Sequence, residues 1–198
     1  MRAAMKPRRT LTIGLQKSVR PYSTAVGELV WASNFCHSRF QLVFSSLLGI
    51  EDLDVGDQIW HSMASDRAQR GALRALTQKL LPAGSRLQRN ILWALDRGDR
   101  LGEQRNDAVH MPTAWMSGYE LIPDITANPR SRLDRMGKLS RPMAEHFRFV
   151  RGDLIALAWY VHGLFCHIAY QSYQPTRPRL SVAAGGKASK PSTRRKKV

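Results

Sequence analysis

The segment LIALAWYVHGLFCHIAY, Leu154–Tyr170, is the longest apolar run in the chain and decides the fold. Its seventeen residues fall short of the roughly 20 that an apolar helix needs to cross a bilayer. A run of this length that also carries His162 and His167 is typical of a helix in the centre of a protein. We therefore predict a central buried helix that follows Pro142 and ends near Tyr170.

Apolar residues at helical spacing continue on the N-terminal side of this run. Within the central helix, the predicted inward-facing residues are Phe147, Val150, Leu154, Leu157, Val161 and Ile168. Upstream, steps of three, four and seven residues predict three more helices, over about 23–48, 57–81 and 85–110. The sequence thus predicts an all-α fold, an up-and-down bundle of four main helices.

Local signals place the ends of these helices. Pro21 precedes the first, and Ser85 followed by Gln88 is a capping-box pattern that opens the third. Pro112 has no backbone N–H and disfavours a helical residue before it, so the third helix should end near His110.

The second predicted helix has two further features. Asp66 and Arg70 are four residues apart, a spacing typical of an ion pair on a helix surface. Small residues recur along the same helix and predict a face that a neighbouring helix can approach closely: Ala64, Ala68, Ala72 and Ala75.

The charge of the chain is concentrated at its ends. The net charge is +16, and residues 1–20 and 174–198 together hold fourteen Lys and Arg and no acidic residue. The rest of the chain, residues 21–173, holds the remaining seventeen basic residues and all fifteen acidic ones, so its net charge is small. We predict a flexible basic arm at 1–20, a helical domain at 21–173 and a disordered basic tail at 174–198. Such tails attract polyanions, RNA above all, although they can also serve only solubility.

A long irregular insertion is predicted between the third and fourth helices, at 111–141, because prolines and glycines interrupt it. Basic residues cluster there and at the C-terminus. The predicted RNA-binding residues are Arg130, Arg132, Arg135, Lys138, Arg141, Arg194, Arg195, Lys196 and Lys197.

The motif with catalytic potential is Glu103–His110, EQRNDAVH. Five residues of a continuous helix turn by roughly 140° and rise about 7.5 Å, so Arg105 and His110 do not share a face. The two can act on one phosphate only if the helix end unwinds or if two copies of the chain pair. An imidazole that takes the 2′-hydroxyl proton and a guanidinium that holds the phosphate are suited to cutting RNA.

An Arg, a following polar residue and a His late in a helical bundle resemble the ribonuclease motif of the HEPN family. The resemblance implies a bundle that dimerises, cuts RNA without a metal and often acts in toxin–antitoxin or anti-phage systems. It also implies His110 as the acid and base and Arg105 as the phosphate ligand, with Asn106 and Glu103 orienting them. The expected partners are RNA, a second copy and an antitoxin or defence protein.

Two alternative interpretations remain, one for Arg105 and one for the whole chain. Arg105 can be a surface residue paired with Asp99 or Glu103, and the chain can be a non-catalytic helical module that binds RNA or protein. His162, Cys166 and His167 are expected to be buried residues rather than metal ligands, so no cofactor is predicted. With two cysteines and no apolar leader, the predicted location is the cytoplasm, without membrane partners.

Overall fold

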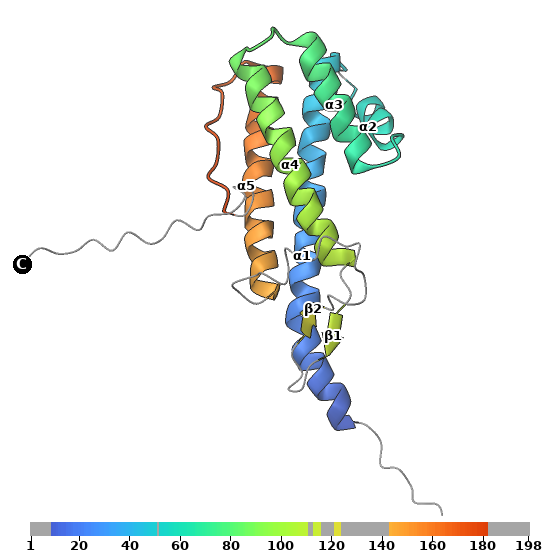
Figure 1. Ribbon diagram of the computed structural model, residues 1–198. Coiled ribbons are helices and arrows are strands. Elements are labelled where there is room, and N and C mark those ends of the chain that lie inside the picture. Colours follow the sequence, from blue (N-terminus) through green and yellow to red (C-terminus); the bar gives the residue numbers. More distant parts are fainter. Residues whose placement is uncertain (1–8, 51, 111–112, 116–120, 124–142, 182–198) are drawn as a thin grey trace, which may run out of the picture.

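Five helices and one short β-ribbon form the described part of the chain in the computed structural model (Figure 1). The structure describes residues 9–50, 52–110, 113–115, 121–123 and 143–181. In chain order the elements are α1 (Arg9–Leu48), α2 (Leu53–His61), α3 (Asp66–Leu80), α4 (Arg86–His110), β1 (Thr113–Trp115), β2 (Leu121–Pro123) and α5 (Met143–Tyr170). The all-α prediction is confirmed.

The central helix is α5, and it packs lengthwise against α1 (Figure 1). Five of its six predicted inward residues are buried: Phe147, Val150, Leu154, Leu157 and Val161. On α1 the facing core includes Leu29, Cys36 and Phe40. By length and composition, α5 is the one described helix that could also cross a membrane. The buried face of α5, however, is covered by α1.

The first helix begins earlier than predicted. We expected its start near Ser23, after Pro21. Instead α1 begins at Arg9 and continues through an exposed Pro21, so residues 9–20 are helical rather than a flexible arm. An interior proline costs a helix one hydrogen bond without having to end it. Figure 1 shows this end of α1 running on beyond α4 and α5.

The second predicted helix is two helices. α2 ends at His61, and Ser65 caps α3 by accepting a hydrogen bond from the backbone N–H of Ala68. The predicted small-residue face is also wrong, because α3 turns a different face toward the core. α3 buries Gln69, Leu73 and Thr77, whereas three of the four alanines are exposed. The bundle therefore consists of α1, α4 and α5, with α2 and α3 in place of one main helix.

Both predicted ends of α4 are confirmed. Ser85 Oγ accepts a hydrogen bond from the N–H of Gln88 at 3.2 Å, and the helix ends at His110. The insertion that follows was predicted to be irregular. Its described residues form a two-stranded antiparallel ribbon, in which Thr113 lies opposite Pro123.

The segment after α5 is ordered where we predicted disorder from residue 174. Residues 171–181, here called the strap, run alongside α5 (Figure 1). The Arg177 guanidinium donates to Asn90 Oδ1 on α4 at 2.9 Å, and the Ser181 hydroxyl donates to the buried carboxylate of Asp153 on α5 at 3.0 Å. Composition alone suggested disorder, but these polar side chains have partners on two helices.

Candidate functional site

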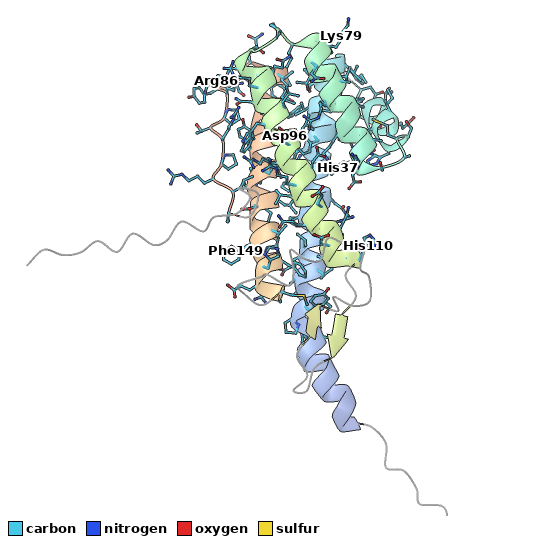
Figure 2. All side chains as sticks on the ribbon, in the orientation of Figure 1. His37, Lys79, Arg86, Asp96, His110 and Phe149 are labelled. Atoms are coloured by element: carbon cyan, nitrogen blue, oxygen red, sulfur yellow. The ribbon has the colours of Figure 1, made fainter. Side chains whose placement is uncertain are left out.

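Arg105 and His110 lie on different sides of one continuous helix. Because α4 has no break between them, the predicted turn of roughly 140° applies. Arg105 is half-buried on the side toward α3, and His110 is exposed in the last turn of α4 (Figure 2). The structure therefore does not bring these two predicted residues into one cavity within a single chain.

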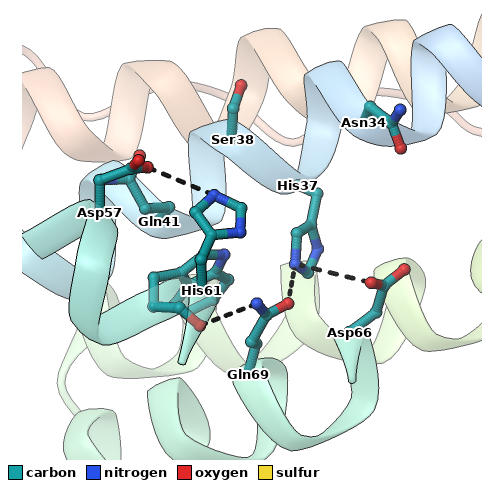
Figure 3. Close-up of a pocket in the computed structure, with 9 residues that line it drawn as sticks. Asn34, His37, Ser38, Gln41, Asp57, His61, Asp66 and Gln69 are labelled. Atoms are coloured by element: carbon teal, nitrogen blue, oxygen red, sulfur yellow. Dashed lines mark hydrogen bonds and ion pairs between the residues drawn. The ribbon is translucent and has the colours of Figure 1, made fainter. Parts of the chain in front are cut away.

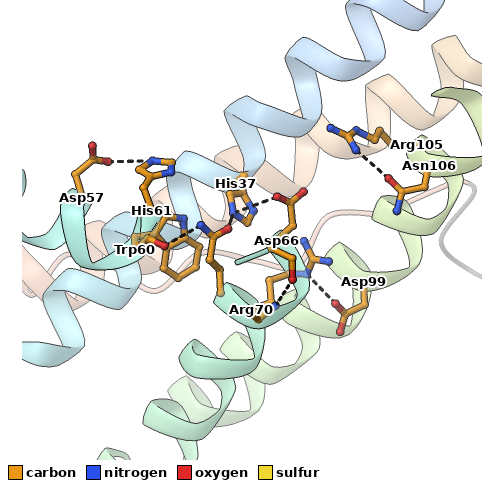
Figure 4. Close-up of polar contacts among 12 residues, drawn as sticks. His37, Asp57, Trp60, His61, Asp66, Arg70, Asp99, Arg105 and Asn106 are labelled. Atoms are coloured by element: carbon orange, nitrogen blue, oxygen red, sulfur yellow. Dashed lines mark hydrogen bonds and ion pairs between the residues drawn. The ribbon is translucent and has the colours of Figure 1, made fainter. Parts of the chain in front are cut away.

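Arg105 and Asn106 do meet. Arg105 Nη1 donates a hydrogen bond to Asn106 Oδ1 at 2.9 Å (Figure 4). Both residues line a cavity of about 280 Å³ between the start of α3 and the late turns of α4. We call it the arginine cavity, and its lining residues are Ser65, Asp66, Arg67, Arg70, Gly102, Arg105 and Asn106.

The Arg70 side chain extends from α3 across α4 to this cavity, but its positive charge is already paired with a carboxylate. Its Nε donates to Asp99 Oδ1 at 2.7 Å, so the predicted ion pair between Asp66 and Arg70 is wrong. Arg74 contacts the same carboxylate at 3.2 Å. Two arginines of α3 are thus held against α4 by an acidic residue that is far away in the sequence.

Glycines of α4 make room for this crossing. A Cβ at Gly102 would lie 3.4 Å from Arg70 Nη2, and a Cβ at Gly98 would lie 3.1 Å from the Phe40 ring. Arg70 can therefore lie flat on α4 with only 12% of its side chain exposed. Asp99 therefore neutralises Arg70 but not the two other arginines that line the cavity, Arg67 and Arg105.

A second cavity, of about 360 Å³, lies beside the first and was not predicted (Figure 3). We call it the histidine cavity. It is bounded by α1, α2 and α3 and lined by Asn34, His37, Ser38, Gln41, Asp57, Trp60, His61, Asp66 and Gln69. Asp66 lines both cavities.

His37 is the most enclosed imidazole of this cavity. Its Nε2 is hydrogen-bonded to Gln69 Oε1 and lies 4.0 Å from a carboxylate oxygen of Asp66. Burial lowers the pKa of His37 below its ordinary value, and the hydrogen bond to Gln69 and the charge of Asp66 offset this only in part. The imidazole is therefore held as a neutral ring near neutral pH.

A third, narrow space shares His37 with the histidine cavity and shares Arg70 and Gly102 with the arginine cavity. It has a volume of about 10 Å³, near the minimum for one water molecule, and is lined by His37, Arg70 and Gly102 among others. Cys36 also borders it, but burial raises the pKa of this thiol to about 12, which leaves it unreactive. The imidazole of His37 and the guanidinium of Arg70 thus border one common space.

The remaining predicted site residues lie outside the described residues: Arg130, Arg132, Arg135, Lys138, Arg141, Arg194, Arg195, Lys196 and Lys197. Among the residues that the structure describes, no three His, Cys, Asp or Glu side chains gather as metal ligands would. His162 Nε2 contacts Cys166 Sγ at 3.7 Å on the half-buried surface of α5.

His37 carried a weak signal in the sequence. It stands beside Cys36 in a helix whose buried stripe was recognised, but its partners come from α2 and α3, at least twenty positions later. Comparisons with protein-family models, curated proteins and solved structures find no match for this chain.

Proposed function

We propose that the protein is a metal-independent endoribonuclease that holds an RNA phosphate in the arginine cavity. The observation that carries this proposal is the Arg105 guanidinium, which Asn106 orients at the edge of a cavity shared with Arg67. Two planar guanidinium groups that converge on one space suit the oxygens of a phosphodiester. Asp66 contributes one negative charge, so the pair of arginines leaves the cavity with a net positive charge.

Arg105 holds the phosphate and stabilises the charge that builds up as the 2′-oxygen attacks phosphorus. His110 supplies acid and base catalysis, as the HEPN resemblance implies. Since His110 lies on another side of α4 from Arg105, it reaches this phosphate from a second copy of the chain. The proposal therefore includes a homodimer with the end of α4 near its two-fold axis.

In the same proposal, the basic residues of the insertion and of the C-terminal tail increase the affinity for RNA by attracting its phosphates. By the HEPN resemblance, the biological setting is a toxin–antitoxin or anti-phage system with a protein partner. The location expected for such a system is the cytoplasm.

The test uses the full-length protein and two matched oligonucleotides, one RNA and one DNA of the same sequence. Cleavage of the RNA in the presence of a chelator, with a 2′,3′-cyclic phosphate at the new end and intact DNA, is the expected result. Loss of cleavage on adding the chelator contradicts the mechanism.

A non-catalytic module that binds RNA is the second candidate. It is favoured by one observation, that no imidazole is among the described residues that line the arginine cavity of a single chain. Binding of the RNA without cleavage in the same experiment, at every RNA concentration, decides for this alternative.

A further inference from the structure

Gln69 fixes which nitrogen of His37 carries the proton. The Gln69 side-chain amide donates to the backbone carbonyl of Trp60 at 2.8 Å, and this contact turns its Oε1 toward His37 (Figure 3). An amide oxygen only accepts hydrogen bonds, so His37 Nε2 must be the donor. In the neutral ring, Nδ1 is then the nitrogen with the lone pair.

The surroundings keep this ring neutral and accessible to a ligand in the cavity. The charged and titratable groups facing His37 are Asp66 and Arg70 from α3 and His61 from α2. His61 is paired with Asp57, one turn earlier, at 3.3 Å. Burial is the largest of these influences and lowers the pKa of His37, yet 15% of its side chain remains exposed.

His37, unlike His110, lines spaces that share residues with the arginine cavity. Asp66 lines both the histidine cavity and the arginine cavity, and the third, narrow space is bordered by His37 and Arg70 together. Figure 4 shows His37, Asp66 and Arg70 side by side, with Arg105 and Asn106 further along α4 from Asp99. His110 lines none of these three spaces.

We propose that His37 is the general base of RNA cleavage, which takes the proton of the attacking 2′-hydroxyl through Nδ1. This inference rests on the proposed function and divides its chemistry between two imidazoles. The 2′-oxygen forms a bond to phosphorus while its proton passes to His37. The bond from phosphorus to the 5′-oxygen breaks, and His110 of a second copy donates a proton to that oxygen. The products are a 2′,3′-cyclic phosphate and a 5′-hydroxyl.

A purely structural histidine predicts a different outcome. The His37 ring lies 5.2 Å from the Trp60 ring, so it also contributes to packing. His37→Gln separates the two roles, because a glutamine places a donor near the position of Nε2 but provides no base. His162→Gln is the matched control: burial lowers the pKa of His162 too, but this residue is on α5 and lines neither cavity.

The experiment measures cleavage of a single-stranded RNA oligonucleotide by the full-length variants between pH 5 and 8. His37→Gln should reduce the cleavage rate by roughly 100-fold or more, the usual contribution of a general base. At pH 8, where the His37 ring is neutral in both the folded and the unfolded chain, its melting temperature and its affinity for the 2′-O-methyl form of the oligonucleotide should stay as in the wild type. His162→Gln should retain the wild-type rate and pH profile.

Gln69→Glu provides a second measurement that does not depend on His37→Gln folding. A carboxylate hydrogen-bonded to Nε2 stabilises the imidazolium, so the acid limb of the rate profile should move to higher pH. An unchanged acid limb overturns the inference, as does wild-type cleavage by His37→Gln, and both leave the proposed function intact. If the wild-type protein cleaves no RNA, the proposed function fails and this inference fails with it.

Discussion

Arg70 Nε donates a hydrogen bond to Asp99 Oδ1 at 2.7 Å and so joins α3 to α4 at the edge of the arginine cavity. The carboxylate cancels a positive charge that the cavity would otherwise present to a phosphate. The positive charge of the cavity is therefore set by a residue that does not line it.

Asp99→Asn should strengthen RNA binding because it leaves the Arg70 charge without its counterion. The dissociation constant at low salt should fall, and the slope of log K against log salt should become steeper. The free energy of unfolding should decrease by about 1 kcal/mol, the upper range for a half-exposed ion pair. Asp96→Asn is the control, since Asp96 pairs with Arg74 and not with Arg70. Equal effects of the two changes on affinity would mean that Asp99 acts only through overall charge.

Mixing two inactive variants should restore activity if the catalytic residues act across a dimer. Arg105→Ala and His110→Ala each lack one part of the site, but a mixed dimer holds one site with both parts. After the two variants are mixed and allowed to exchange subunits, RNA cleavage should return to about a quarter of the wild-type rate, as expected when half the dimers are mixed and each has one intact site. Light scattering checks the dimer in each sample. If activity does not return despite subunit exchange, either one chain supplies both residues of a site or neither residue is part of the site.

Removing residues 182–198 should weaken RNA binding and leave stability unchanged. This stretch holds six of the eight basic residues of the predicted tail, so the salt dependence of binding should become shallower. Truncation after residue 173 removes most of the strap as well and breaks the contacts of Arg177 and Ser181. Thermal unfolding should then show a loss of about 2 kcal/mol or more, from roughly 1 kcal/mol for each hydrogen bond. Identical melting temperatures for the two truncations would contradict the strap's role.

Acid should destabilise the protein through two partly buried imidazoles, those of His37 and His162. Burial lowers the pKa of both His37 and His162, so below about pH 6.5 the unfolded chain binds more protons than the folded chain. The free energy of unfolding should therefore fall as the pH is lowered from about 7 to 5. His37→Gln should make this decline less steep in urea titrations at several pH values, and His61→Gln, at an exposed position, should change it less. A decline of the same slope in His37→Gln would contradict the pKa assignment.

Features that depend on neighbours in the sequence were predictable. The inward face of α5, the Ser85 cap and the end of α4 at His110 each follow from residues within one or two helical turns. The HEPN resemblance implied that Asn106 orients Arg105, and the two neighbouring side chains are hydrogen-bonded. The chemical roles given to these residues remain predictions.

Features that depend on distant partners were missed or wrong. Asp66 was assigned to Arg70 on spacing alone, whereas the competing acceptor, Asp99, comes from another helix. His37 and Gln69 are 32 positions apart, and no local pattern indicates that they meet. The strap resembled a disordered tail because its binding sites are on α4 and α5 and not in its own sequence.

The glycines of α4 have a consequence for recognising relatives of this chain. A methyl group at residue 98 would lie 3.1 Å from the buried Phe40 ring of α1, which would have to shift, whereas one at residue 102 would make ordinary contact with the flexible end of Arg70. Descendants of a common ancestor can exchange surface residues freely, but position 98 tolerates little growth without disturbing the packing of α4 on α1. A glycine at position 98 facing an aromatic ring at position 40 is therefore a feature by which to recognise distant homologues, including those whose tails and insertions have diverged completely.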